Sequence, residues 1–122
     1  MTEHCRAFDM SDAGEAWDHI TKNGYDVIRD WGDEAYGHFL HTWDDGKRLL
    51  CRCRNCKGLF MFQKSEFHGF DGEDSYYRDY FPVESEEEAE KLTERFGGFE
   101  IERAFKGRYL MRTNGGVHWS RA

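Results

Sequence analysis

The sequence predicts an α+β fold, a mostly antiparallel sheet of about five to seven strands with two helices, in a single domain spanning residues 1–122. Three observations lead to this prediction. Two segments carry apolar residues at helical spacing. Short runs rich in aromatic and β-branched residues, separated by turns with glycine and aspartate, fill most of the remaining chain. The 122 residues fit one domain, and 10 Phe, 6 Tyr and 4 Trp can build a core although only 39% of the residues are hydrophobic.

The first helix is expected from about Asp12 to Lys22. Asp12 can cap the first turn, and Glu15 stands three residues later, at the position of a capping-box partner. Ala16 and Ile20 fall on one face at helical spacing. The Asn-Gly pair that follows Lys22 is a typical helix end.

Five strand-like runs follow the first helix, and turn or loop residues separate them. The expected turns lie at 32–34, 44–46 and 55–58, and an acidic, glycine-containing loop is expected at 69–75. The expected strands are Tyr25–Trp31, Tyr36–Trp43, Lys47–Arg54, Leu59–Phe67 and Tyr76–Val83.

The second helix is marked by Ser85-x-x-Glu88, a capping box that places Glu86 and Glu87 in the first turn. Negative charge in that turn is favoured by the helix dipole. An apolar stripe at helical spacing follows, and Gly97 ends the helix. Beyond it, strands are expected at Phe99–Phe105, Arg108–Thr113 and Val117–Trp119, with a turn at 114–116.

The most informative feature is the run from Cys51 to Gly58, in which Cys53-x-x-Cys56-x-Gly58 has the form of one zinc knuckle. Two thiolates at this spacing can bind one ion where the chain turns, and the glycine lets the backbone curl so that amide groups face the sulfurs. The motif resembles half of a zinc ribbon, whose second knuckle this chain lacks. We therefore predict a structural zinc ion bound by Cys53 and Cys56.

The remaining zinc ligands must come from elsewhere in the chain. Cys51 shares a strand face with Cys53 and is predicted as the third ligand, with Cys5 as the fourth. His68 is disfavoured because a strand starting at Leu59 would carry it roughly 30 Å from the knuckle. Three histidines stay open as alternatives, and a fourth stands beside Cys5: His38, His41, His118 and His4. The competing interpretation is a group of buried cysteines without metal.

No catalytic signature stands out, and we expect a protein that is not an enzyme. Arg52 and Arg54 would lower the pKa of a thiol at Cys53, but no family signature surrounds them. The acidic stretch from Asp71 to Asp74 lacks the spacing of an EF-hand. The glycine pairs read as turn residues, because the spacing of phosphate-binding loops is absent.

Charge is distributed in blocks along the chain, whose net charge is −7. Residues 1–46 and 65–102 are acidic, with net charges of −8 and −10, whereas 47–64 and 103–122 are basic, with +6 and +5. Such blocks predict faces of opposite sign or strands that pair basic against acidic neighbours. The start of the chain has acids where a signal peptide would be apolar, so we expect a cytoplasmic protein with reduced thiols.

The first functional hypothesis is an acidic, inhibitor-type binding protein that docks on a basic, nucleic-acid-handling protein. Toxin-immunity proteins and phage anti-defence proteins such as anti-CRISPRs are functional classes of this size and charge. The acidic residues expected to contact the partner lie in the 69–75 loop and on the second helix: Asp71, Glu73, Asp74, Glu86, Glu87 and Glu88.

The alternative hypothesis is direct binding of nucleic acid through the basic strands at 47–64 and 103–112. Phe60, Phe62 and Tyr109 are interleaved with these cations and could stack on bases. The net charge of −7 argues against this alternative, although segregation of the charges weakens the objection.

Overall fold

The computed structural model describes residues 4–32, 45–68, 74–96 and 100–120, and within them six strands form one antiparallel sheet. The strands lie in chain order, so each pairs with the next strand along the sequence. Their bounds are β1 Tyr25–Gly32, β2 Asp45–Cys53, β3 Leu59–His68, β4 Asp74–Pro82, β5 Leu110–Thr113 and β6 Gly116–Trp119. The predicted α+β fold with an antiparallel sheet is confirmed.

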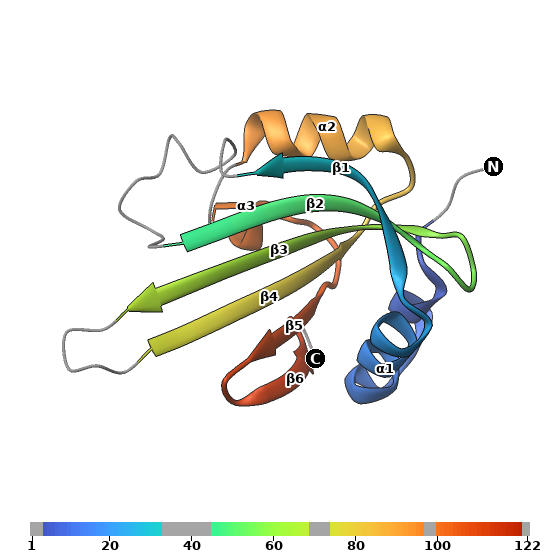
Figure 1. The fold of residues 1–122 in the computed structure, drawn as a ribbon, viewed down its shortest axis with the longest axis horizontal. Coiled ribbons are helices and arrows are strands. Elements are labelled where there is room, and N and C mark those ends of the chain that lie inside the picture. Colours follow the sequence, from blue (N-terminus) through green and yellow to red (C-terminus); the bar gives the residue numbers. More distant parts are fainter. Residues whose placement is uncertain (1–3, 33–44, 69–73, 97–99, 121–122) are drawn as a thin grey trace.

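The helical segments are a short 3-10 helix η1 (Arg6–Asp9) and the α-helices α1 (Ala13–Asn23), α2 (Glu86–Arg95) and α3 (Glu100–Ala104). Figure 1 shows α1 beside β6, and α2 at the opposite edge of the molecule beside β1. Both predicted caps are present. The Asp12 side chain accepts a hydrogen bond from the Glu15 N–H at 3.0 Å, and Ser85 accepts one from the Glu88 N–H at 3.1 Å.

Alternate residues of each strand face opposite sides of the sheet and build two apolar cores. On one side, here named the α1 face, Phe60 and Phe62 of β3 pack in a cluster with Ile20 of α1. On the other side, the α2 face, Met61 of β3 packs with Ile101 of α3 and with residues of α2. Both faces of the sheet are therefore covered. Large aromatic side chains form much of the two cores, which compensates for the modest hydrophobic content of the chain.

The prediction of a strand at 99–105 is wrong, because α3 occupies Glu100–Ala104. Ile101 and Phe105 fit strand alternation, but they are also four residues apart and fit a helix equally well. The Phe105 N–H donates to the Ile101 carbonyl oxygen at 2.9 Å, and both side chains pack in the core of the α2 face. The helical turn thus buries the same apolar pair without a place in the sheet.

Two predicted connections are shorter than expected. The predicted turn at 44–46 includes Asp45 and Gly46, but these residues begin β2 and pair with β3. Asp74 and Ser75 were assigned to the acidic loop, but they begin β4 and also pair with β3. Because β3 extends beyond its apolar positions, it offers backbone pairing partners to these four residues. Strand pairing then outweighs their weak local preference for a turn or loop. The predicted strand Tyr36–Trp43 lies outside the described residues, and so do residues 69–73 of the predicted acidic loop.

Three polar residues, Arg48, Gln63 and Asp79, occupy paired positions of β2, β3 and β4 on the α2 face, each at most 1% exposed. The Arg48 Nε donates to the Gln63 Oε1 at 3.0 Å, and its Nη1 donates to the Phe96 carbonyl oxygen at 2.7 Å. The buried guanidinium therefore has polar partners and joins the end of α2 to the sheet.

The buried carboxyl group of Asp79 contacts that of Glu102 on α3. Burial raises the pKa of Asp79 well above its usual range, the charge of Glu102 and a hydrogen bond with it raise it further, and Arg48 opposes them. Burial also raises the pKa of Glu102, while the Asp79 hydrogen bond and the charge of Arg103 act the other way. The pair therefore retains one proton to higher pH than an isolated carboxyl group does, with Asp79 as the donor.

We expect Asp79→Asn to remove a pH dependence of stability. A carboxyl pKa that is raised on folding stabilises the protein fully below the unfolded value of about 3.9, and this stability is lost as pH rises towards the folded pKa. Asparagine keeps a donor and carries no charge, so the variant should become relatively more stable with rising pH, by about 1.4 kcal/mol per pH unit in that window. Urea unfolding at pH 4 to 9 measures this. Parallel stability profiles of the two proteins would contradict it, and the exposed Asp18→Asn is the control.

Candidate metal centre

The β2–β3 turn holds Cys53 at the end of β2 and Cys56 in the turn itself. Lys57 has φ 65°, in the left-handed region, and its N–H donates to the Cys53 carbonyl oxygen at 3.0 Å. The Cys53 N–H donates to the Gly58 carbonyl oxygen at 2.9 Å. These two bonds close a tight loop, and the Cys53 and Cys56 sulfurs lie within 4.8 Å of each other, as the knuckle motif predicts.

Cys5 reaches this turn from the N-terminal segment. Its N–H donates to the Leu59 carbonyl oxygen at 3.0 Å, and the next residue, Arg6, donates its N–H to the Cys56 Sγ at 3.4 Å. The chains approach so closely that a Cβ on Gly58 would lie 2.4 Å from the Cys5 Cα. Glycine at 58 is therefore required by the docking of the N-terminal segment.

His19 reaches the turn from α1. Its Nε2 lies 3.6 Å from the Cys53 Sγ, and the side-chain nitrogen of Asn23 lies 3.3 Å from its Nδ1. The Asn23 side chain also donates to the His19 carbonyl oxygen at 2.8 Å. One ring nitrogen thus faces the cysteines, and the side-chain nitrogen of Asn23, one helical turn away, lies beside the other.

The four ligand atoms of Cys5, His19, Cys53 and Cys56 all lie within 4.8 Å of one another, close enough to hold a metal ion. The Cys5 and Cys56 sulfurs are 3.6 Å apart, as are the Cys53 sulfur and the His19 Nε2. A tetrahedral ion with bonds of about 2.3 Å to sulfur and about 2.0 Å to nitrogen requires S–S edges of about 3.8 Å and S–N edges of about 3.5 Å. The two separations of 3.6 Å are close to these edges, and the other four are at most 4.8 Å.

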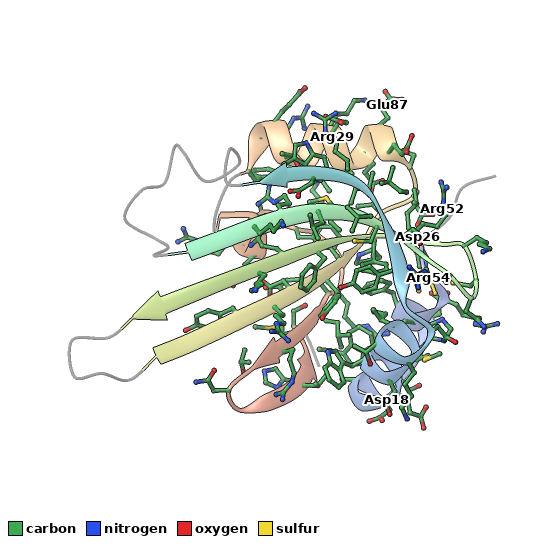
Figure 2. All side chains as sticks on the ribbon, viewed as in Figure 1. Asp18, Asp26, Arg29, Arg52, Arg54 and Glu87 are labelled. Carbon is green, nitrogen blue, oxygen red and sulfur yellow. The ribbon has the colours of Figure 1, made fainter. Side chains whose placement is uncertain are left out.

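The surroundings favour the thiolate form of Cys56, whereas burial raises the pKa of Cys5. Burial alone would raise the pKa of Cys56, but the N–H groups of Arg6 and Gly58 and hydrogen bonds from His19 and Cys5 lower it to about 6. Thiolate is the form that binds metal ions. Figure 2 shows Arg52 and Arg54 at this end of the sheet, and the Arg54 Nε donates to the Asp26 Oδ1 at 2.9 Å.

The structure brings together three of the four cysteines predicted as ligands: Cys5, Cys53 and Cys56. Cys51 lies outside the group. It is fully buried in the core of the α1 face, and burial raises its pKa to about 12. Two residues of extended strand separate Cys51 from Cys53 by about 6.6 Å, well beyond the edge of a metal tetrahedron. His19, instead of Cys51, is the fourth member of the group.

The histidines considered from the sequence do not contribute a ligand among the described residues. His4 directs its Nδ1 to Glu84 at 2.6 Å and its Nε2 to Asp9 at 2.9 Å, which anchors the segment before Cys5. His118 is exposed on β6, and His68 ends β3 at the far end of the sheet from the turn. His38 and His41 lie outside the described residues.

His19 was missed because no motif connects it to the cysteines. The only sequence signal is its place at the border of the apolar face of α1, three residues after Ala16 and beside Ile20. A half-buried histidine at such a border, on a helix that packs near a cysteine turn, is accessible to prediction only once that packing is known.

The described acidic residues among the proposed partner contacts come from two parts of the fold, the start of β4 and the first turn of α2. Asp74 begins β4 and Glu86 follows its other end, so the strand places them roughly 25 Å apart. Glu86 and Glu87 are exposed on α2, and Glu88 is half-buried. Figure 2 shows Glu87 on the outer side of that helix. Asp71 and Glu73 lie outside the described residues.

Comparison of the chain with protein-family models, curated proteins and solved structures finds no significant match. No helix among the described residues is long and apolar enough to cross a membrane. The functional argument therefore rests on the geometry of the site and on the charged surfaces.

Proposed function

We propose that this protein is a non-catalytic, zinc-stabilised binding module that acts in a reducing compartment such as the cytoplasm. The single observation that carries the proposal is the four-residue group Cys5, His19, Cys53 and Cys56. It joins the N-terminal segment, α1 and the β2–β3 turn, three parts of the chain that Figure 1 shows at one end of the sheet.

The donor set supports zinc with a structural role. Three thiolates and one imidazole in tetrahedral arrangement form a ligand set typical of structural zinc sites. A catalytic zinc site keeps one position for water or substrate, whereas the four protein ligands here complete the coordination. Such an ion stabilises the fold directly, because the unfolded chain does not preform the site.

The exposed surface of α2 supports a protein partner of basic character. Glu86 and Glu87 project from its first turn, and the chain as a whole carries a net charge of −7. An acidic helix of this kind can steer association with a basic, nucleic-acid-handling protein and occupy the surface that binds the nucleic acid. An inhibitor-type role is the corresponding functional proposal.

Charge reversal on α2 tests the partner. We expect the tagged wild-type protein to capture a basic protein from host lysate in a salt-sensitive manner. Glu86→Lys combined with Glu87→Lys should weaken that complex at least tenfold, because like charges then face each other. The control reverses the same charge on α1, with Glu15→Lys and Asp18→Lys, and should leave binding intact.

The comparison measures the dissociation constant of the captured partner, purified, at two salt concentrations. Equal affinity of the wild type and the α2 variant would remove this helix from the interface. Far-ultraviolet circular dichroism of both variants verifies the fold, since each reversal at a helix N-terminus costs only about 0.3–1 kcal/mol.

The alternative of base stacking by the basic strands loses support. Phe60, Phe62 and Tyr109 are buried, at 0%, 8% and 6% exposure, and serve the two cores. Arg48 is also buried, and Arg108 donates to the Phe8 and Met10 carbonyl oxygens at 2.9 and 2.8 Å. The residues expected to contact bases are therefore buried in the cores or hydrogen-bonded within the fold.

A further inference from the structure

The thiols of Cys5 and Cys56 lie side by side, with their sulfurs 3.6 Å apart, although the two residues are 51 positions apart in the chain. Backbone groups set this approach. The Cys5 N–H donates to the Leu59 carbonyl oxygen at 3.0 Å, and the Arg6 N–H donates to the Cys56 Sγ at 3.4 Å. The N-terminal segment and the β2–β3 turn therefore hold the two thiols together through their main chains.

This arrangement is close to that of a disulfide. Bonded sulfurs are about 2.05 Å apart, so the two atoms must approach by about 1.5 Å, which small rotations of both side chains can supply. The Cys53 sulfur also lies within 4.8 Å of the Cys56 sulfur, but it is 3.6 Å from the His19 Nε2. Cys5 is therefore the better-placed partner for Cys56.

Access to the group differs among its sulfurs. Cys56 is half-buried, whereas Cys5 and Cys53 are 0% exposed. A small oxidant from solvent therefore reaches the Cys56 sulfur first. A thiol oxidised to sulfenic acid forms a disulfide when a second thiol stands beside it, and Cys5 occupies that position.

We propose that hydrogen peroxide joins Cys5 and Cys56 in a reversible disulfide and thereby dismantles the metal centre. The loss of metal in this inference rests on the proposed function, whose zinc site it makes responsive to oxidation. The pairing of the two thiols rests only on their geometry.

The reaction proceeds in two steps. The Cys56 thiolate attacks peroxide, so that the O–O bond breaks, an S–O bond forms and hydroxide leaves. The Cys5 thiolate then attacks the Cys56 sulfur, so that the S–S bond forms, the S–O bond breaks and a second hydroxide leaves. The two sulfurs lose two electrons, which peroxide gains, and each hydroxide takes a proton from solvent to become water.

Oxidation changes what holds this end of the sheet together. Only His19 and Cys53 remain as ligands, fewer than the four that a structural zinc site uses. The N-terminal segment gains a covalent bond to the β2–β3 turn, whereas α1 loses the ion that it shares with the turn through His19. A reducing thiol reverses the reaction and restores the full ligand set.

Peroxide treatment of the reduced wild-type protein, followed by a tryptic map without reductant, tests the pairing. Trypsin cleaves after Arg6, Arg52, Arg54 and Lys57, which places each of the four cysteines in a separate peptide. At about 0.1 mM peroxide we expect residues 1–6 to be linked to residues 55–57. The four free thiols should fall to two, while a chelating dye records the release of zinc in parallel. Dithiothreitol with zinc should restore both.

Cys5→His provides a variant with four ligands that cannot form the disulfide, because imidazole also binds zinc. We expect it to release its metal at least tenfold more slowly in peroxide than the wild type. Cys51→Ala is the matched control. It also removes one buried cysteine, but one outside the metal group, and it should release zinc at the wild-type rate.

A link between residues 53–54 and 55–57 would overturn the pairing, and so would four free thiols after treatment with about 1 mM peroxide. Release of zinc from Cys5→His as fast as from Cys51→Ala would also overturn the inference. Reduced wild-type protein without zinc would instead overturn the proposed function. The tryptic map would still decide in that case whether Cys5 and Cys56 pair, so the two failures are distinguishable.

Discussion

Cys53→Ala is expected to abolish metal binding and to unfold most of the domain at room temperature. Wild-type protein purified without added metal should contain one zinc ion per chain, because the ligand set Cys5, His19, Cys53 and Cys56 is complete within the chain. Structural zinc contributes apparent binding energies of about 10–16 kcal/mol in small zinc domains, whereas a whole domain is typically stable by about 5–15 kcal/mol. Loss of one thiolate therefore removes a contribution comparable to the total stability.

Cys51→Ala is the matched control for that prediction. Cys51 and Cys53 are both 0% exposed, lie on the same strand and belong to the same apolar core. Removing the Cys51 sulfur should cost only about 1–2 kcal/mol of packing and leave one zinc per chain. Metal analysis and thermal unfolding measure both proteins. If the two variants lose equal stability and neither preparation contains zinc, the cysteines serve the core alone.

The parts of the fold that the sequence predicted correctly are those fixed by local chemistry. Asp12 and Ser85 define helix starts through their own side chains, which accept hydrogen bonds from residues three positions on. Strand geometry by itself directs neighbouring residues such as Phe60 and Met61 of β3 to opposite faces, where they join the two cores. Ile101 and Phe105, in contrast, satisfy two periodicities, and only packing decides between them.

The metal centre divides in the same way. Cys53 and Cys56 were predictable because their spacing is itself the geometry of a knuckle. Cys51 was predicted because strand alternation places it on the same face as Cys53. Sharing one ion across about 6.6 Å required the strand to curl there, and β2 instead continues as a strand through Cys53. His19 depends on how α1 rotates against the sheet, a property of tertiary packing. Local sequence therefore predicted the thiolate pair, Cys5 was also predicted correctly as a member of the group, and the three-dimensional arrangement was needed to find His19.

Gly58→Ala is expected to destabilise the protein by about 3 kcal/mol or more and to loosen the metal. The added Cβ would lie 2.4 Å from the Cys5 Cα, 2.6 Å from the Cys5 nitrogen and 2.6 Å from the His4 carbonyl oxygen. All three are backbone atoms, so no side-chain rotation relieves the overlap. The N-terminal segment must move away, and Cys5 moves with it, which leaves three ligands at the turn.

Gly115→Ala separates this effect from the general cost of replacing a glycine. A Cβ at Gly115, in the β5–β6 turn, meets nothing closer than the Thr113 Oγ1 at 3.6 Å, so the substitution should be nearly neutral. The measurements are the melting temperature and the rate at which a chelator removes the metal. We expect Gly58→Ala to melt at least 10 °C below Gly115→Ala and to lose its metal faster. Equal chelation rates would mean that Cys5 is not a ligand, because the substitution acts on the metal only through the displacement of Cys5. The chelation rate therefore tests whether the N-terminal segment completes the site or only covers it.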